Sequence, residues 1–171
     1  MNRHSSCLEA AFRPRYLILG TVLLLLLEIP PRLAAGPRAA AEGYDSIPST
    51  ALLRPEDVAN ALQPHANDRP LIFQVGSRLM YVQAHIPGAE YVGAASTSEG
   101  IKQLQSRVSN LKRDRFIVIY CGCCPWNRCP NIRPAYKQMR TMGFTHVKVL
   151  YIANNFGSDW VDKDYPTEKG K

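Results

Sequence analysis

An apolar run leads into a cysteine-rich segment in Ile117-Val118-Ile119-Tyr120-Cys121-Gly122-Cys123-Cys124-Pro125-Trp126-Asn127-Arg128-Cys129-Pro130-Asn131-Ile132-Arg133. It opens with β-branched and aromatic residues, a run typical of a strand that is covered on both faces of a sheet. The run ends at Cys121, and three more cysteines follow, at positions 123, 124 and 129. Apart from Cys7, these four are all the thiols in the chain. We therefore expect a buried strand with a dense thiol cluster at its carboxyl end.

The rest of the chain alternates between strand and helix patterns. Short apolar runs predict strands at 71–75, 91–92, 116–120 and 146–151. Apolar residues spaced three and four apart predict helices at 53–62, 96–112 and 132–142. The second helix is expected to begin with a capping box from Ser96 to Glu99. This alternation predicts an α/β fold, with a mostly parallel central sheet flanked by helices on both faces.

Residues 1–41 are predicted to be a signal peptide or an N-terminal membrane anchor, followed by a linker at 42–51 and a domain at 52–168. Arg13 and Arg15 precede an apolar run at 16–27, which is shorter than the ~20 residues that span a bilayer. A small-residue cleavage pattern follows at Ala39-Ala40-Ala41. We expect an exported protein, periplasmic or otherwise extracytoplasmic. An uncleaved membrane tether through residues 16–27 is the alternative.

The net charge of +7 does not predict a nucleic-acid partner. Residues 1–41 hold five arginines against two glutamates, and the remaining chain holds 16 basic and 12 acidic residues. The second excess is spread along the chain, with one short cluster at residues 112–115. Such spreading favours a solvated surface over a binding stripe for nucleic acid.

Cys121 is the predicted nucleophile because of its place between a strand and a helix. Ligands of open α/β sheets bind at the carboxyl ends of the strands. Backbone N–H groups of a following loop and helix stabilise negative charge there, which lowers the pKa of a thiol. Arg128 and Arg133 are predicted to bind an anionic substrate or to stabilise the thiolate.

Three roles stay open for Cys123, Cys124 and Cys129. They can form structural disulfides, which oxidising compartments favour. They can take part in thiol–disulfide exchange or resolve an intermediate on Cys121, since residues 121–124 have C-x-x-C spacing. Together with Cys121 they can bind a soft metal. We favour thiol chemistry without a metal or other cofactor, because one short loop is poorly suited to surround an ion.

Four features in the same order as in the rhodanese-like family make the chain resemble that family. They are Leu71-Ile72-Phe73-Gln74-Val75, Tyr81 with His85-Ile86-Pro87-Gly88-Ala89, Ile117-Val118-Ile119-Tyr120-Cys121, and Met142-Gly143-Phe144 through Leu150, Trp160 and Tyr165-Pro166. The second resembles the family's "Y…GHIPGA" signature, with Ala84 in place of the first glycine. The resemblance covers residues 52–168 and implies a single rhodanese-like domain, in which the turn at His85 is structural.

The resemblance also implies a sulfurtransferase that carries sulfane sulfur as a persulfide on Cys121. Its partners would be a small anionic sulfur donor, a thiol acceptor and a thiol-redox protein. Three departures distinguish this chain: Gln74-Val75-Gly76 replaces the family's "DVR", Leu79-Met80 replaces an acid, and the loop after Cys121 is enlarged. The alternatives are a soft-metal or thiol-redox module on this scaffold and a catalytically silent interaction domain.

Overall fold

The sheet of this domain is parallel throughout. The computed structural model describes residues 47–63 and 68–170, and within them five strands form one sheet in the order β1-β5-β4-β2-β3. The strands are β1 (Leu52–Leu53), β2 (Leu71–Gln74), β3 (Glu90–Tyr91), β4 (Ile117–Tyr120) and β5 (Val147–Leu150). All four pairings between these strands are parallel, with β4 in the centre. The predicted α/β fold is confirmed.

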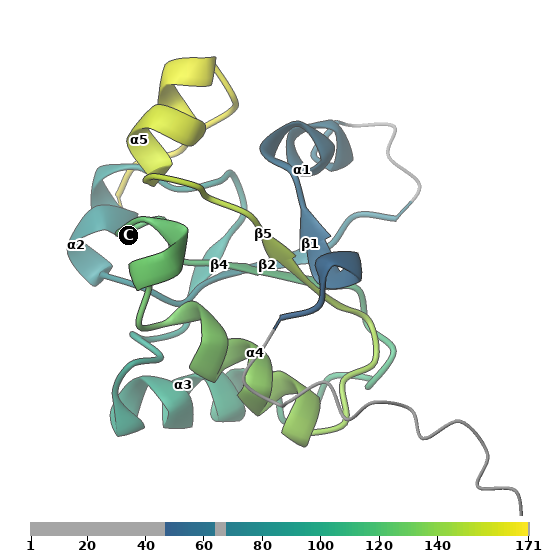
Figure 1. Cartoon of the computed structure of the whole chain (residues 1–171). Coiled ribbons are helices and arrows are strands. Elements are labelled where there is room, and N and C mark those ends of the chain that lie inside the picture. The colour runs from purple at the N-terminus through teal and green to yellow at the C-terminus, as the bar shows by residue number, and fades with distance from the viewer. Residues whose placement is uncertain (1–46, 64–67, 171) are drawn as a thin grey trace, which may run out of the picture. The chain divides into compact units, whose positions relative to one another are not determined.

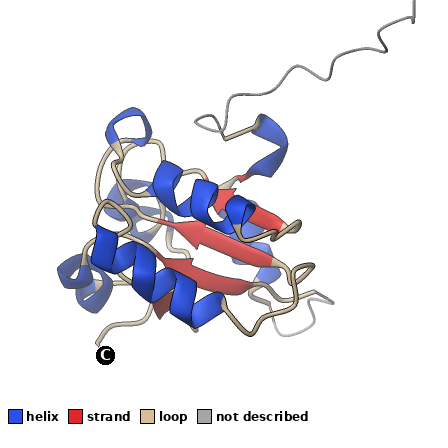
Figure 2. Cartoon of the chain, turned by 90° about the horizontal axis from the view of Figure 1, so that it is seen from below, coloured by secondary structure: helices blue, strands red, loops and turns tan. Residues whose placement is uncertain are grey.

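Helices cover both faces of the sheet, as the sequence predicts. They are α1 (Pro55–Ala61), α2 (Arg78–Gln83), α3 (Ser98–Val108), α4 (Ile132–Thr141) and α5 (Phe156–Asp159). α3 and α4 lie on one face, and α1 and α5 lie on the other (Figure 1). Seen from below, α3 and α4 lie side by side in front of the strands (Figure 2).

β4 is apolar at every position because its side chains enter two separate cores. Ile117 and Ile119 belong to the core under α3 and α4, whereas Val118 and Tyr120 belong to the core under α1 and α5. None of these four side chains is more than 1% exposed. A strand with both faces buried cannot show the alternation of a half-exposed strand, so the continuous apolar run is its expected signature.

Several predicted boundaries are corrected by local hydrogen bonds. The N-cap of α3 is Thr97 and not Ser96, because Thr97 Oγ1 accepts from the Gly100 N–H over 3.0 Å. The N–H of Ser96 instead donates to Asn131 Oδ1 over 2.9 Å. α3 ends at Val108, before the predicted end at Lys112. Leu53, expected at the start of a helix, belongs to β1, which pairs with β5. α2 was not predicted.

The predicted N-terminal targeting segment at 1–41 and the first half of the linker lie outside the described residues. The linker's later residues include a single 3-10 turn at Ser49–Ala51, and Ala51 is buried. Among the helices of residues 47–63 and 68–170, none is long and apolar enough to cross a bilayer. The apolar run at 16–27 lies outside these residues.

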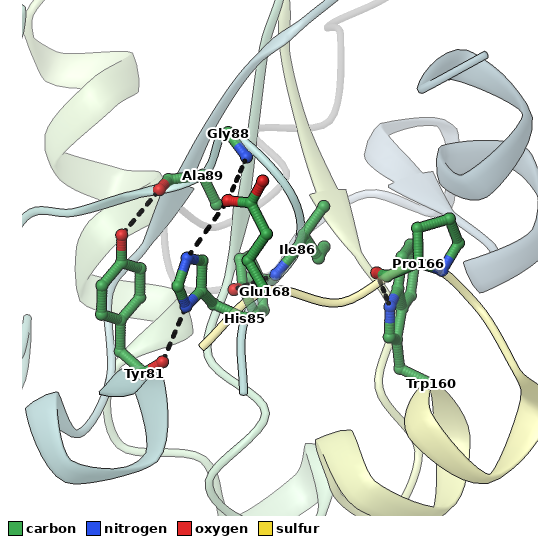
Figure 3. Close-up of polar contacts among 9 residues, drawn as sticks. Tyr81, His85, Ile86, Gly88, Ala89, Trp160, Pro166 and Glu168 are labelled. Atoms are coloured by element: carbon green, nitrogen blue, oxygen red, sulfur yellow. Dashed lines mark hydrogen bonds and ion pairs between the residues drawn. The ribbon is translucent and has the colours of Figure 1, made fainter. Parts of the chain in front are cut away.

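The turn at His85 is held by the C-terminal segment (Figure 3). His85 and Glu168 exchange backbone hydrogen bonds of 2.9 and 2.8 Å. His85 Nδ1 lies 2.8 Å from the Tyr81 carbonyl oxygen, and its Nε2 lies 3.7 Å from the Glu168 carboxylate. The Tyr81 hydroxyl donates to the Ala89 carbonyl over 2.8 Å. These contacts give His85, which is 4% exposed, the structural role that the sequence predicts.

The strand order creates a topological switch point between β2 and β4. In the sheet, β2 has its successor β3 on one side, whereas β4 has its successor β5 on the opposite side. The carboxyl ends of the adjacent strands β2 and β4 therefore meet where the chain changes direction of winding. Open α/β sheets bind their ligands at such a point. Cys121 follows β4 directly, so the fold brings the predicted nucleophile there.

The close approach of α3 to the preceding loop yields a stability prediction. A Cβ atom at Gly100 would lie 2.0 Å from the Ala94 carbonyl oxygen and 2.7 Å from the Ala94 nitrogen. Alanine favours a helix by about 1 kcal/mol over glycine, yet overpacking costs roughly 1–3 kcal/mol. We expect Gly100→Ala to lower the free energy of unfolding in urea denaturation.

Lys102→Ala is the matched control, because Lys102 is exposed on the same helix. It tests the effect of a new alanine without the backbone clash and should change the free energy of unfolding by less than about 0.5 kcal/mol. A Gly100→Ala protein that is more stable than the original would show that the loop at Ala94 yields without cost.

Candidate active site

Cys121 packs directly against the backbone at the end of β2. A Cβ atom added to Gly76 would lie 2.7 Å from the Cys121 Sγ. The buried side chain of Gln74 joins the same two segments, since its Nε2 donates to the Cys121 carbonyl over 3.2 Å and its Oε1 accepts from the Gly76 N–H over 3.1 Å. A carboxylate at position 74 could accept the second bond but could not donate the first. Gln74, in the segment that replaces "DVR", therefore makes a hydrogen bond to Cys121 that a carboxylate could not make.

The loop after Cys121 is fastened to the segment around α5. The Phe156 N–H donates to the Gly122 carbonyl over 2.9 Å, and the Trp126 N–H donates to the Ala153 carbonyl over 3.0 Å. Gly122 has φ of 72°, and a Cβ atom there would lie 2.8 Å from the Phe156 Cβ. Only glycine meets both the positive φ and the close approach without strain.

With these hydrogen bonds in place, the four thiols of the loop lie close together. The Sγ atoms of Cys121, Cys123, Cys124 and Cys129 lie within 4.8 Å of one another. Cys121 Sγ is 3.0 Å from Cys123 Sγ, which is 3.3 Å from Cys124 Sγ. Cys121 and Cys129 are buried, whereas the other two are partly exposed. The loop thus brings its four sulfur atoms together, and the prediction that a single short loop is poorly suited to surround an ion stays a prediction.

Asn131 connects the thiols to the loop that precedes α3, and it was not predicted as a site residue. Its Nδ2 lies 3.4 Å from Cys121 Sγ and 3.7 Å from Cys123 Sγ, within reach for N–H···S hydrogen bonds. Its Oδ1 accepts from the Ser96 N–H, which fixes the orientation of the amide. Asn131 is 4% exposed. A sequence signal existed, since Asn131 ends the cysteine loop just before α4, but nothing local shows that its amide turns toward sulfur.

The thiols divide into two pairs with opposite pKa shifts. Hydrogen bonds to Cys123 and Cys129, together with burial, raise the pKa of Cys121. The hydrogen bond from Cys121 lowers the pKa of Cys123 to about 6 and that of Cys129 to about 6. Burial raises the pKa of Cys124 to about 12. The direction for Cys121 differs from the predicted lowering of its pKa, because its thiol shares a hydrogen bond with Cys123 and is buried.

A small pocket opens beside Cys121. Its volume is about 200 Å³, below the ~300–1,000 Å³ of pockets for drug-sized ligands. Besides Cys121, the lining residues include Met80 and Gln83 of α2 and Asn155 and Gly157 at α5. Among the described residues, those that line this pocket carry no charge. The pocket fits a small molecule or the end of a larger one.

The two arginines predicted to bind an anion lie near the loop but not in the wall of this pocket. The Arg133 guanidinium lies 6.0 Å from the centre of the Trp126 ring, a cation–π contact. Arg128 is exposed, and its backbone carbonyl lies 3.9 Å from Cys124 Sγ. Anion binding by Arg128 and Arg133 stays a prediction.

The fold and the site define a parallel α/β domain with a cluster of thiols at the carboxyl end of its central strand. The sequence model of the rhodanese-like domain matches residues 55–152. This match covers more than half of the chain, so the protein belongs to the rhodanese-like family. The clustered cysteines fit the sulfurtransferases of this family. The comparison with curated protein sequences returns no match.

Solved structures share the fold. The Alr3790 protein of Anabaena sp. is 24% identical, with a TM-score of 0.53 over 69% of this chain and 92% of that chain. A solution structure of the rhodanese-like domain of the same protein is 22% identical, with a TM-score of 0.52 over 70% of this chain and 79% of that one. The single-domain sulfurtransferase RDL2 of Saccharomyces cerevisiae is 14% identical, with a TM-score of 0.50 over 69% and 94%. At these identities the likeness concerns the fold alone.

The pKa is raised for Cys121 and lowered for Cys123, and these opposite shifts predict which thiol reacts first with an alkylating agent. The reactive form is the thiolate, and the lowered pKa of Cys123, about 6, makes it mostly thiolate at neutral pH. Cys123 is also the more accessible of the two low-pKa thiols. We expect iodoacetamide to label Cys123 with a rate that rises between about pH 5 and pH 7 and then levels off, well below the pKa of ~8.5 of a free cysteine.

Peptide mapping by mass spectrometry of reduced, metal-free protein measures this order. Cys121 should remain unlabelled at neutral pH, because its pKa is raised and it is 5% exposed. Preferential labelling of Cys121 below pH 7 would contradict the arrangement in which it donates to its neighbours.

Proposed function

We propose that this protein is a sulfurtransferase that carries sulfane sulfur as a persulfide on Cys121. The observation that carries the proposal is the position of Cys121, which stands at the switch point of the sheet, lines a small pocket and has a second thiol, Cys123, 3.0 Å from its sulfur. A nucleophile and a group able to take its proton within hydrogen-bond reach are the usual signature of covalent catalysis.

Sulfur loading begins with proton transfer from Cys121 to the Cys123 thiolate. The Cys121 thiolate then attacks the outer sulfur of a donor such as thiosulfate. A new S–S bond forms on Cys121, the S–S bond of the donor breaks, and sulfite leaves with the electron pair. The reaction needs no change of oxidation state in the protein beyond the persulfide itself. Arg128 and Arg133 are proposed to attract an anionic donor to the loop.

Unloading has two routes that share this persulfide. An external thiol can take the outer sulfur and leave the Cys121 thiolate. Alternatively, the Cys123 thiolate attacks Cys121 Sγ, which forms a Cys121–Cys123 disulfide and releases hydrosulfide. The first route returns the enzyme unchanged. The second oxidises the protein thiols by two electrons, so an external dithiol protein is needed to reduce the disulfide.

Thiol-redox proteins and oxidising conditions both occur outside the cytoplasm, which suits the proposed location. The N-terminal pattern of a basic segment, a short apolar run and small residues supports export. We propose that the domain works in the periplasm or another extracytoplasmic space, either released or held by an uncleaved tether through residues 16–27. Cell fractionation of the full-length chain tests this location.

Substitution of Cys121 tests whether its thiol carries the transferred sulfur. We expect Cys121→Ser to abolish sulfur loading, because serine cannot form a persulfide. Reduced protein is exposed to thiosulfate or polysulfide, and intact-mass and peptide spectra are searched for one added sulfur. Cys7→Ser is the matched control and should load as the unchanged protein does. An added sulfur on the Cys121→Ser protein in equal amount would assign the carrier role to another thiol.

The resolving role of Cys123 gives a separate prediction. Without its attack on Cys121, the persulfide has no internal nucleophile at 3.0 Å. We expect Cys123→Ser protein to load sulfur more slowly, because the acceptor of the Cys121 proton is lost. Once loaded, it should retain the persulfide and release hydrosulfide more than about tenfold more slowly, given the size of proximity effects. Sulfide release is followed together with the persulfide mass. Equal release by both proteins would leave only the external thiol route.

A further inference from the structure

We propose that the four loop thiols form a binding site for a single thiophilic metal ion, and that their number best suits Zn²⁺. This site goes beyond sulfur transfer, which uses Cys121 and Cys123 only. Cys124 and Cys129 have no part in the proposed transfer, yet the fold holds them in the same cluster. The inference rests on where the four sulfur atoms lie.

The spacing of the sulfur atoms matches one four-coordinate ion. Zn–S bonds of ~2.3 Å in a tetrahedron place the sulfurs about 3.8 Å apart. In this domain all four Sγ atoms lie within 4.8 Å of one another, and two of the separations are 3.0 and 3.3 Å. The required value lies inside this range, so small side-chain rotations suffice. An iron–sulfur cluster would place its own irons and sulfides between the thiolates and needs a wider arrangement.

The surroundings of the cluster resemble the outer shell of a thiolate metal site. Asn131 Nδ2 lies within hydrogen-bonding reach of Cys121 and Cys123, and Ser96 holds the amide from its other end. The backbone N–H groups of Asn131 and Ile132, at the start of α4, donate toward the Cys129 sulfur. Such donors orient metal ligands and spread their negative charge, which would be −2 for four thiolates around Zn²⁺.

A metal in this site would exclude sulfur transfer while it is bound. Four protein sulfurs close the coordination of a tetrahedral ion, which is typical of a structural site and leaves no open position for a substrate. Cys121 would be a ligand, and its lone pair would not be free to attack a donor. The site would therefore give the protein two exclusive states, one metal-bound and one able to load sulfur.

The test uses the reduced full-length chain under anaerobic conditions, with Co²⁺ as the spectroscopic probe. We expect one Co²⁺ per chain, with the visible absorption of tetrahedral cobalt and the near-ultraviolet charge transfer of thiolate ligands. Zn²⁺ should displace the cobalt one for one. Co²⁺ bound without thiolate charge transfer, or in no fixed ratio, would overturn the inference. So would reduced protein that binds neither ion.

Variants assign the ligands. Cys124→Ser and Cys129→Ser should each weaken Zn²⁺ binding by more than the ~10–100-fold that loss of an outer-shell partner costs, and Asn131→Ala should weaken it within that range. Cys7→Ser is the control and should bind as the unchanged chain does. Circular dichroism shows whether each variant is folded. Folded Cys124→Ser protein with unchanged affinity would overturn a four-thiol site.

The result is independent of the proposed sulfur transfer. Persulfide formation is measured on metal-free protein, whereas metal binding is measured without a sulfur donor. Metal-free protein that loads sulfur but binds no Zn²⁺ refutes the metal site alone. Protein that binds Zn²⁺ but loads no sulfur after the metal is removed refutes only the transferase proposal and leaves the metal site standing.

Discussion

The contact between the Cys121 sulfur and the backbone of Gly76 is the constraint on which the site depends. It joins the ends of two neighbouring strands, since a side chain at position 76 would occupy the place of the sulfur. Gln74 strengthens this junction with one donated and one accepted hydrogen bond. Cys121 is thereby buried at the end of the sheet, and it lines a pocket together with residues of α2 and α5.

Two departures from the rhodanese-like pattern, the residues at the end of β2 and the enlarged loop after Cys121, affect the same site in the structure. The glycine and the amide at the end of β2 accommodate a sulfur and a carbonyl from the end of β4. The enlarged loop then supplies three more thiols and the anchoring amide of Asn131. Each change alone looks like a loss of family residues. Together they build a thiol-rich environment in place of a charged one.

The sequence predicts the sheet well because buried strands carry an unambiguous signal. The apolar run at β4 and the order of motifs are sufficient for the parallel α/β fold and for Cys121 at a strand end. β1 was missed because Leu53 was assigned to the helix that follows it, and α2, at Arg78–Gln83, was missed because a helix of six residues is too short to show a period. The convergence of four sulfurs and the role of Gln74 depend on contacts between residues up to 47 positions apart, which no local pattern contains.

The attachment of Gly122 and Trp126 to the segment at α5 makes the cysteine loop preorganised. Its backbone is ordered when the domain folds, so little conformational entropy remains to be lost when a ligand or an intermediate forms there. The thiols also cannot separate freely, because movement of the loop away from the sheet would break its hydrogen bonds to Phe156 and Ala153. Movement of the loop away from the sheet is therefore tied to local unfolding of the segment around α5.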